Sequence, residues 1–163
     1  MDDQRRPVSR QTLDIATSNA PGDEHQYRID EQIGFLLRVV NQGHTAVFTR
    51  LIGDDLSSMQ FSLLARLAEI GPLSQNELGR RISTDGSTVL GIVSRLRKRG
   101  LVETVKSNTD NRRLLVKLTD FGHAVYERNV PPAKEISTVT LAMLSRVEAE
   151  TLVTLLKKMA AGD

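Results

Sequence analysis

The sequence predicts a mainly α-helical fold with one small two-stranded sheet, an α+β arrangement dominated by helices. Three segments begin with Ser followed three residues later by Gln or Glu, a pattern typical of helix N-termini. Apolar residues elsewhere return every three or four positions, as they do on one face of a helix. Residues 101–106 and 113–118 instead have the composition of short strands, and the turn-rich segment SNTDN joins them.

The first long helix is expected from Asp30. Ile33 and Leu37 begin an apolar stripe with helical spacing, and Gly53 should end the helix. Residues 1–27 before it are polar and contain two prolines, so they are expected to form a flexible N-terminal extension. Residues 28–162 are expected to form one domain.

Three later helices have recognisable start signals. In each, a serine hydroxyl and the side chain three residues later can satisfy backbone N–H groups that lack a partner within the helix. The pairs are Ser57 with Gln60, Ser74 with Glu77, and Ser145 with Glu148. Helices should therefore begin near residues 58, 75 and 146.

Another helix is expected over residues 85–99, capped by Thr84 or Asp85 and ended by Gly100. Its apolar stripe is Val89, Ile92, Val93 and Leu96. With the preceding short helix it forms a helix-turn-helix over residues 74–99, and the two strands form a wing over 101–118. The predicted architecture is a winged helix-turn-helix between long flanking helices.

A further helix should start after Thr119 and run to about Asn129. Pro131 and Pro132 should interrupt or kink it, because neither proline can donate a backbone hydrogen bond. The last helix is amphipathic.

Positive charge is concentrated in residues 74–118. This segment contains ten Lys or Arg and four Asp or Glu, a formal charge of +6, whereas the whole chain carries +2 and the remainder therefore −4. Such a distribution is expected when one face meets a polyanion and the rest does not.

Composition argues against several other classes of protein. No apolar run approaches the roughly 20 residues needed to span a bilayer, and the polar N-terminus lacks the apolar stretch of a secretory signal. There is no cysteine for a disulfide or a thiol switch, and the histidines at 25, 44 and 123 are too scattered to suggest a metal site. No phosphate loop or catalytic constellation is present. We expect a cytoplasmic protein that is not an enzyme and uses no cofactor.

The stretches LSQNELGRRI, DGSTVLGIVSRLRKRGLVE and DNRRLLVKLTDFG resemble MarR-type transcriptional regulators, over residues 30–161. The last stretch is the most specific, with an Asp-x-Arg tip and a strand that ends in Leu-Thr before a Gly. The resemblance implies an obligate homodimer that binds pseudo-palindromic double-stranded DNA, most often as a repressor, and is released by a small ligand. A non-specific or architectural nucleic-acid-binding protein without an effector is the alternative.

The DNA-binding residues are expected on the helix-turn-helix and the wing. The outward face of the helix over 85–99 should read bases, with Leu90 against thymine methyls. The resemblance implies that Asp110 braces Arg112, which reaches into the minor groove. The full set is Ser74, Gln75, Thr84, Ser87, Thr88, Leu90, Gly91, Arg95, Arg97, Asp110 and Arg112. Arg80, Lys98, Arg99 and Lys106 are further candidates for phosphate contacts.

A ligand site is expected around His44, which lies on the apolar stripe of the first helix. A histidine satisfied within the core is the alternative. An imidazole beside Phe48 and Phe61, with Arg38 or Arg66 within reach, would suit a planar aromatic acid such as a hydroxylated nicotinate, benzoate or urate-like compound.

Dimerisation is expected through the terminal helices, over residues 28–53 and 120–161. Their apolar residues exceed what a monomer of this size would leave on its ends, although an intramolecular core would also use them. The candidates are Ile33, Leu141, Leu152, Leu155, Leu156 and Met159.

Overall fold

The computed structural model describes residues 27–107, 110 and 112–162. The flexible extension predicted over residues 1–27 therefore lies, apart from Tyr27, outside the described residues. The chain divides into two compact units, Met1–Leu36 and Leu37–Asp163. The described part of the first contains the 3₁₀ turn η1 (Ile29–Glu31) and the start of α1 (Ile33–Leu51).

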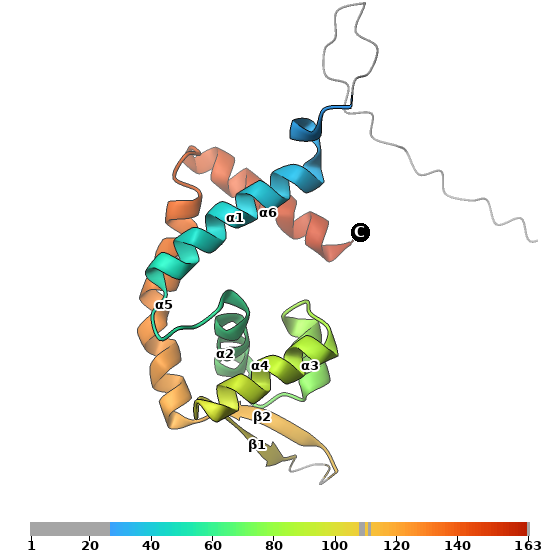
Figure 1. The fold of residues 1–163 in the computed structure, drawn as a ribbon, viewed down its shortest axis with the longest axis vertical. Coiled ribbons are helices and arrows are strands. Elements are labelled where there is room, and N and C mark those ends of the chain that lie inside the picture. Colours follow the sequence, from blue (N-terminus) through green and yellow to red (C-terminus); the bar gives the residue numbers. More distant parts are fainter. Residues whose placement is uncertain (1–26, 108–109, 111, 163) are drawn as a thin grey trace, which may run out of the picture. The chain divides into compact units, whose positions relative to one another are not determined.

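The second unit contains the rest of α1, a helix-turn-helix, a wing and two more helices (Figure 1). The elements after α1 are α2 (Ser58–Ile70), α3 (Gln75–Arg81), α4 (Gly86–Lys98), β1 (Val102–Lys106), β2 (Leu114–Leu118), α5 (Asp120–Thr140) and α6 (Arg146–Ala161). This order and the two-stranded sheet confirm the predicted winged helix-turn-helix.

The predicted capping serines begin their helices at the expected residues. The hydroxyls of Ser57, Ser74 and Ser145 accept the backbone N–H groups of Gln60, Glu77 and Glu148. At Ser57 and Ser145 the side chain three residues on also accepts from the capping residue's N–H, which completes the capping box.

The core lies among α2, α3, α4, the sheet and α5. Its fully buried side chains come from each of these elements: Leu63, Leu64, Leu78, Val89, Ile92, Leu96, Val102, Val116 and Val125. The strands are antiparallel, with Val102 opposite Leu118 and Lys106 opposite Leu114. Leu73, before α3, pairs with Val116 and ties the helix-turn-helix to the wing.

The Leu-Thr-Asp-Phe-Gly stretch joins the wing to α5. The Thr119 hydroxyl donates to the Gly100 carbonyl at 2.6 Å and accepts the Gly122 N–H at 2.9 Å, so it caps α5 and holds the end of α4. A Cβ at Gly122 would lie 1.9 Å from the Leu101 carbonyl oxygen, so this position has no room for a side chain.

Of the predicted interruption or kink at Pro131 and Pro132, the interruption is wrong, because α5 continues through both prolines to Thr140. A proline in a helix leaves the carbonyl four residues earlier without its backbone donor. These carbonyls belong to Glu127 and Arg128, which are exposed, so water can take the place of the missing donors. The buried side of α5 is held instead by Asn129.

Asn129 and Arg128 attach α5 to the loop between α1 and α2. Asn129 accepts the Gly53 N–H at 3.0 Å and donates to Asp54 at 2.7 Å. Arg128 donates to both carboxylate oxygens of Asp54, at 2.7 and 3.3 Å. Arg99, which follows α4, donates to the backbone carbonyls of Asp54 and Asp55. One short loop is therefore held from both α4 and α5.

Candidate nucleic-acid interface

The helix α4 presents two distinct faces. Val89, Ile92, Val93 and Leu96 are buried, as predicted, and Ser87, Thr88, Leu90 and Arg95 are exposed. Leu90 is 57% exposed, although nothing in the core requires an apolar side chain at that position. Gly91 is half-buried, and a Cβ there would lie 3.8 Å from an Nη atom of Arg95, so the guanidinium lies back over the helix.

Asp85 is the N-cap of α4 and was not among the predicted site residues. Its carboxylate accepts the Thr88 N–H at 2.9 Å, the Thr88 hydroxyl at 2.7 Å, and the Ser87 hydroxyl. These hydrogen bonds, first from Ser87 and then from Thr88, hold the pKa of Asp85 well below its usual range. The sequence did offer Asp85 as a cap, but it gave no sign that the cap would also engage both hydroxyls proposed to read bases.

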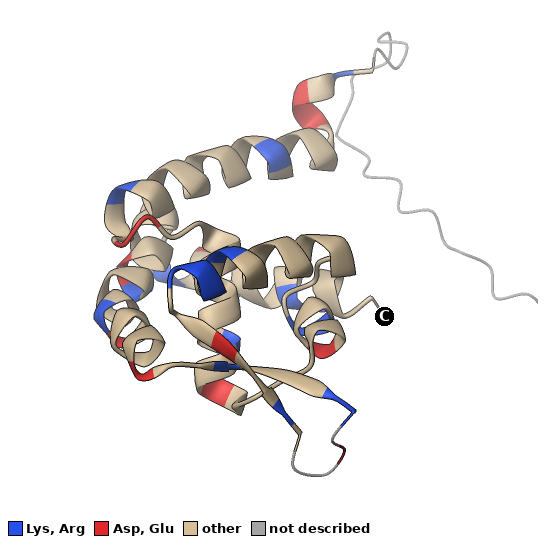
Figure 2. Cartoon of the chain, turned by 60° about the horizontal axis from the view of Figure 1, so that its bottom comes forward, with Lys and Arg blue, Asp and Glu red and all other residues tan. Residues whose placement is uncertain are grey.

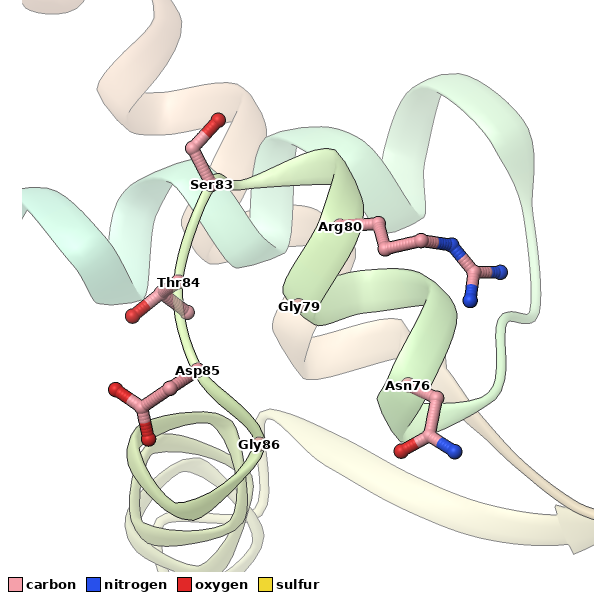
Figure 3. Close-up of a pocket in the computed structure, with 7 residues that line it drawn as sticks. All are labelled: Asn76, Gly79, Arg80, Ser83, Thr84, Asp85 and Gly86. Carbon is pink, nitrogen blue, oxygen red and sulfur yellow. The ribbon is translucent and has the colours of Figure 1, made fainter.

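A hollow lies between α3 and the start of α4 (Figure 3). Thr84 and Asp85 line it from the turn, Asn76 and Arg80 from α3. Gly79 allows the two helices this close approach, because a Cβ there would lie 3.0 Å from the Thr84 carbonyl oxygen. The predicted contacts Ser74 and Gln75 are half-buried at the start of α3, where the Ser74 hydroxyl already accepts the Glu77 N–H.

The basic residues of 74–118 lie mainly at the end of α4 and on the wing, as the blue segments of Figure 2 show. Three of the ten are engaged within the protein. Lys117 pairs with Glu103 at 2.9 Å, Arg81 lies 3.9 Å from Glu77, and Arg99 holds the loop of Asp54. Arg99 thus has a structural role at this loop, and its predicted phosphate contact stays a prediction.

The other seven form no ion pair with another described residue. They are Arg80, Arg95, Arg97, Lys98, Lys106, Arg112 and Arg113. Cations without an internal partner are available to phosphate oxygens, and their release of counterions makes DNA binding salt-dependent.

On the wing, Asp110 forms hydrogen bonds with both arginines that follow it. Its carboxylate accepts the Arg112 backbone N–H at 3.0 Å, and its carbonyl accepts the Arg113 N–H at 2.9 Å. Asp110 thus contacts the backbone of Arg112, while its predicted role in directing the Arg112 side chain into a groove stays a prediction. The exposed Arg112 guanidinium remains available for a groove or a phosphate.

A second cluster, of aromatic rings, forms where α1, α2 and α5 meet. Phe48 and Phe61 lie edge to face at 6.2 Å, and Tyr126 stacks on Phe61 at 5.9 Å. His44 Nδ1 lies 3.0 Å from the Thr140 hydroxyl in a partly buried hydrogen bond. The sequence did not indicate Tyr126, because its stacking on Phe61 is a contact between distant segments, and it did not indicate Thr140, because the helix was predicted to end at about Asn129.

Arg66 and Arg38 are the two cations predicted for the ligand site. Arg66 follows Phe61 by five residues, which turns it to another face of α2, and it pairs with Glu69 at 2.7 Å. It lines a different surface with Ser62, Arg81 and Ile82. Arg38 is exposed on α1, six residues before His44.

Four of the six predicted dimerisation residues are exposed in the single chain. Ile33, Leu155, Leu156 and Met159 are 60%, 53%, 40% and 58% exposed, and Leu141 and Leu152 are half-buried. Several neighbours on α6 and the segment before it are also exposed, Met143, Val147 and Val153 among them.

Comparison with known proteins identifies the family. A MarR-family model matches residues 54–113, from the loop before α2 to the wing. The HTH-type transcriptional repressor NicR of Pseudomonas putida is 39% identical over 147 residues, which cover 90% of this chain and 93% of NicR. The chain belongs to the MarR family of transcriptional regulators.

Solved MarR-type structures resemble the chain over most of its length. A probable transcriptional regulator from Pseudomonas aeruginosa has 45% sequence identity and a TM-score of 0.77, over 81% of this chain and 99% of that one. BpsR of Bordetella bronchiseptica, whose DNA binding is regulated by 6-hydroxynicotinic acid, has 35% sequence identity and a TM-score of 0.81. The match covers 85% of this chain and 100% of BpsR. No helix in the described part of this MarR-family chain is both long and apolar enough to cross a membrane.

Proposed function

We propose that this MarR-family regulator is a homodimeric repressor that binds a pseudo-palindromic operator through α4 and the wing, and that a small aromatic acid releases it. The outward face of α4 carries the DNA-binding part of this proposal. Ser87, Thr88 and Leu90 stand exposed near its N-terminus, where recognition helices contact base edges. Arg95 and the wing cations that form no ion pair with a described residue flank them.

The dimer is supported by the apolar side chains that the single chain leaves in solvent. Leu155, Leu156 and Met159 lie within one and a half turns of α6 and are all exposed. A contiguous apolar face of this kind marks an interaction surface. A second copy related by a two-fold axis would bury it and would place two copies of α4 to meet two half-sites.

The effector is proposed to bind at the cluster of Phe48, Phe61 and Tyr126. Phe61 and Tyr126 are only half-buried, so a planar ring can extend their stack. His44, about one turn before Phe48 on α1, is proposed to supply a polar contact, and its Nδ1 lies within hydrogen-bond distance of the Thr140 hydroxyl. Because NicR and BpsR resemble this chain, and 6-hydroxynicotinic acid regulates the DNA binding of BpsR, hydroxylated pyridine and benzene carboxylic acids are the first class to test.

The test is binding of the full chain to the promoter DNA next to its own gene, measured by fluorescence anisotropy with and without a panel of aromatic acids. We expect specific binding that weakens steeply with salt and is reversed by one or more of the acids. Equal affinity for promoter and random DNA would instead indicate the architectural alternative.

Variants then test the effector site. His44→Ala should weaken effector binding about tenfold, about 1.4 kcal/mol, and leave DNA affinity without effector unchanged. Arg66→Ala is the matched control, since Arg66 lies on another face of α2, and its effector affinity should equal that of the wild type. An unchanged effector affinity in His44→Ala by calorimetry would contradict the proposed site.

A further inference from the structure

We infer that Asp85 fixes the hydrogen-bonding sense of Ser87 and Thr88, so that the start of α4 reads exocyclic amino groups of adenine or cytosine in the major groove. This inference rests on the proposed function, because it names what the recognition helix selects. Asp85 is a positioning residue here, and the two hydroxyl oxygens make the contacts.

The geometry fixes the direction of both hydroxyl protons. An ionised carboxylate can only accept hydrogen bonds, so the hydroxyls of Ser87 and Thr88 must donate to Asp85. Each hydroxyl has a single proton, and that proton is then engaged. Each hydroxyl oxygen keeps lone pairs for an outside partner, so both side chains present acceptors to solvent and to DNA.

Bases differ in what they present to such acceptors. In the major groove adenine and cytosine present amino donors, at N6 and N4, whereas guanine presents N7 and O6 and thymine presents O4, which are all acceptors. An acceptor placed against guanine O6 or thymine O4 leaves two lone pairs facing each other. The start of α4 should therefore favour an amino-bearing base and exclude a keto-bearing base at the same position.

The negative charge of Asp85 is tolerable on a surface that meets phosphates for two reasons. It lies at the N-terminus of α4, where the helix dipole favours a negative group. Arg95, two turns beyond Thr88, and the other cations of α4 and the wing lie on the same interface. Leu90 and Arg95 can read the two other bases, because Leu90 can contact a thymine methyl and Arg95 can donate to guanine.

The variant Asp85→Asn isolates this effect. Asparagine caps helices as well as aspartate does, so it can still accept the Thr88 N–H. Its amide nitrogen is a donor, however, and a hydroxyl that accepts from it must turn its own proton outward. Selection from a random duplex library should give wild-type sites with adenine or cytosine at the position contacted by Ser87 and Thr88. Asp85→Asn should admit guanine or thymine there.

A base analogue provides the second measurement. Replacing the contacted adenine by purine, or the cytosine by 2-pyrimidinone, removes only the amino group. This should weaken wild-type binding about tenfold, the upper range for one hydrogen bond, and should barely affect the double variant Ser87→Ala/Thr88→Val. Arg112→Ala is the control, because it should weaken binding to both duplexes equally and keep their ratio.

The outcomes separate this inference from the proposed function. If the wild type selects no sequence, the proposed function fails. If it selects a sequence but tolerates removal of each amino group, or if Asp85→Asn selects the same bases as wild type, the inference is overturned and the proposed function stands. Should Asp85→Asn fail to fold by circular dichroism, the analogue measurement on the double variant decides.

Discussion

At the scale of one residue, Gly122 explains why the Leu-Thr-Asp-Phe-Gly stretch ends in glycine. The Leu-Thr-Asp-Phe-Gly stretch brings α5 so close to the start of β1 that a side chain at 122 would meet the Leu101 carbonyl. Thr119 secures the same corner through its bonds to Gly100 and Gly122. The glycine provides the space and the threonine provides the cap, so neither can be replaced alone.

We expect Gly122→Ala to lower the free energy of unfolding by about 3 kcal/mol, the upper range for overpacking. The substituted methyl group cannot be accommodated unless α5 moves away from Leu101. Urea denaturation followed by circular dichroism measures this. Gly43→Ala in α1 is the matched control, because no atom lies within 4 Å of the added Cβ, and it should leave stability unchanged or raise it. Equal stabilities for the two variants would contradict the packing described here.

Asp54, in the loop between α1 and α2, makes the stability of the folded protein depend on pH. Hydrogen bonds from Asn129 and then from Arg128 lower the pKa of its carboxyl in the folded protein. The unfolded chain therefore binds a proton at this residue at a higher pH than the folded chain does. The stabilisation is complete above the ordinary pKa of aspartate and is lost as the pH falls through the folded value.

Asp54→Asn should accordingly destabilise the protein by about 2 kcal/mol at pH 7, and the difference from wild type should shrink as the pH is lowered below 4. Urea titrations at several pH values measure both. Asp55→Asn removes a neighbouring charge and should change stability by less than about 0.5 kcal/mol. A difference between Asp54→Asn and wild type that does not depend on pH would rule out this origin.

At the scale of elements, the wing combines a two-stranded sheet with a hydrogen bond from Arg112 to Asp110. The register from Val102–Leu118 to Lys106–Leu114 carries Arg112 and Arg113 to the far end of the sheet. Asp110 then fixes the backbone at Arg112. This hydrogen bond restrains the backbone at Arg112, which reduces the entropy lost when its side chain binds DNA.

Arg112→Ala should weaken operator binding at least tenfold, about 1.4 kcal/mol, while the unfolding transition stays unchanged. Arg99→Ala provides the contrast, since Arg99 holds the loop of Asp54 and should lower stability before it affects DNA affinity. Anisotropy titrations alongside thermal melts distinguish the two. Wild-type affinity in Arg112→Ala would remove the wing from the interface.

The elements were predictable from sequence where their signals are local. Ser57, Ser74 and Ser145 define helix starts through contacts three residues away, and the stripe from Val89 to Leu96 identifies the buried face of α4. The course of α5 through the prolines was not predictable from local sequence. It depends on the exposure of Glu127 and Arg128, whose carbonyls lose their backbone donors, and on the hydrogen bonds of Asn129 to the distant Gly53 and Asp54. Tyr126 and Thr140 depend on the same long-range packing. The involvement of Asp85 with both hydroxyls required side-chain geometry.

At the scale of the whole molecule, the single chain has a well-filled core around α2 to α5 and leaves the apolar side of α6 in solvent. A MarR-family chain with such a face is expected to need its second copy for DNA binding, since each copy supplies one α4 for one half-site. Stability and operator affinity should then both depend on protein concentration.

Leu155→Glu should convert the dimer to a monomer and weaken operator binding at least a hundredfold, because a charge would have to be buried in the interface. Sedimentation equilibrium and anisotropy measure the two effects. Lys157→Glu, a change of charge at an exposed polar position two residues away, should leave the dimer intact. A monomeric wild type with full operator affinity would contradict the proposed assembly.

The attachment of one loop to two helices also has a kinetic consequence. Gly53, Asp54 and Asp55 are held by Arg99 after α4 and by Arg128 and Asn129 in α5. Opening of the last turn of α4 releases Arg99 from this loop, and we expect the loss of this support to weaken the loop's contacts with the middle of α5. In native-state hydrogen exchange, the amides of these two segments should exchange as one cooperative unit, and Asn129→Ala should separate them into two.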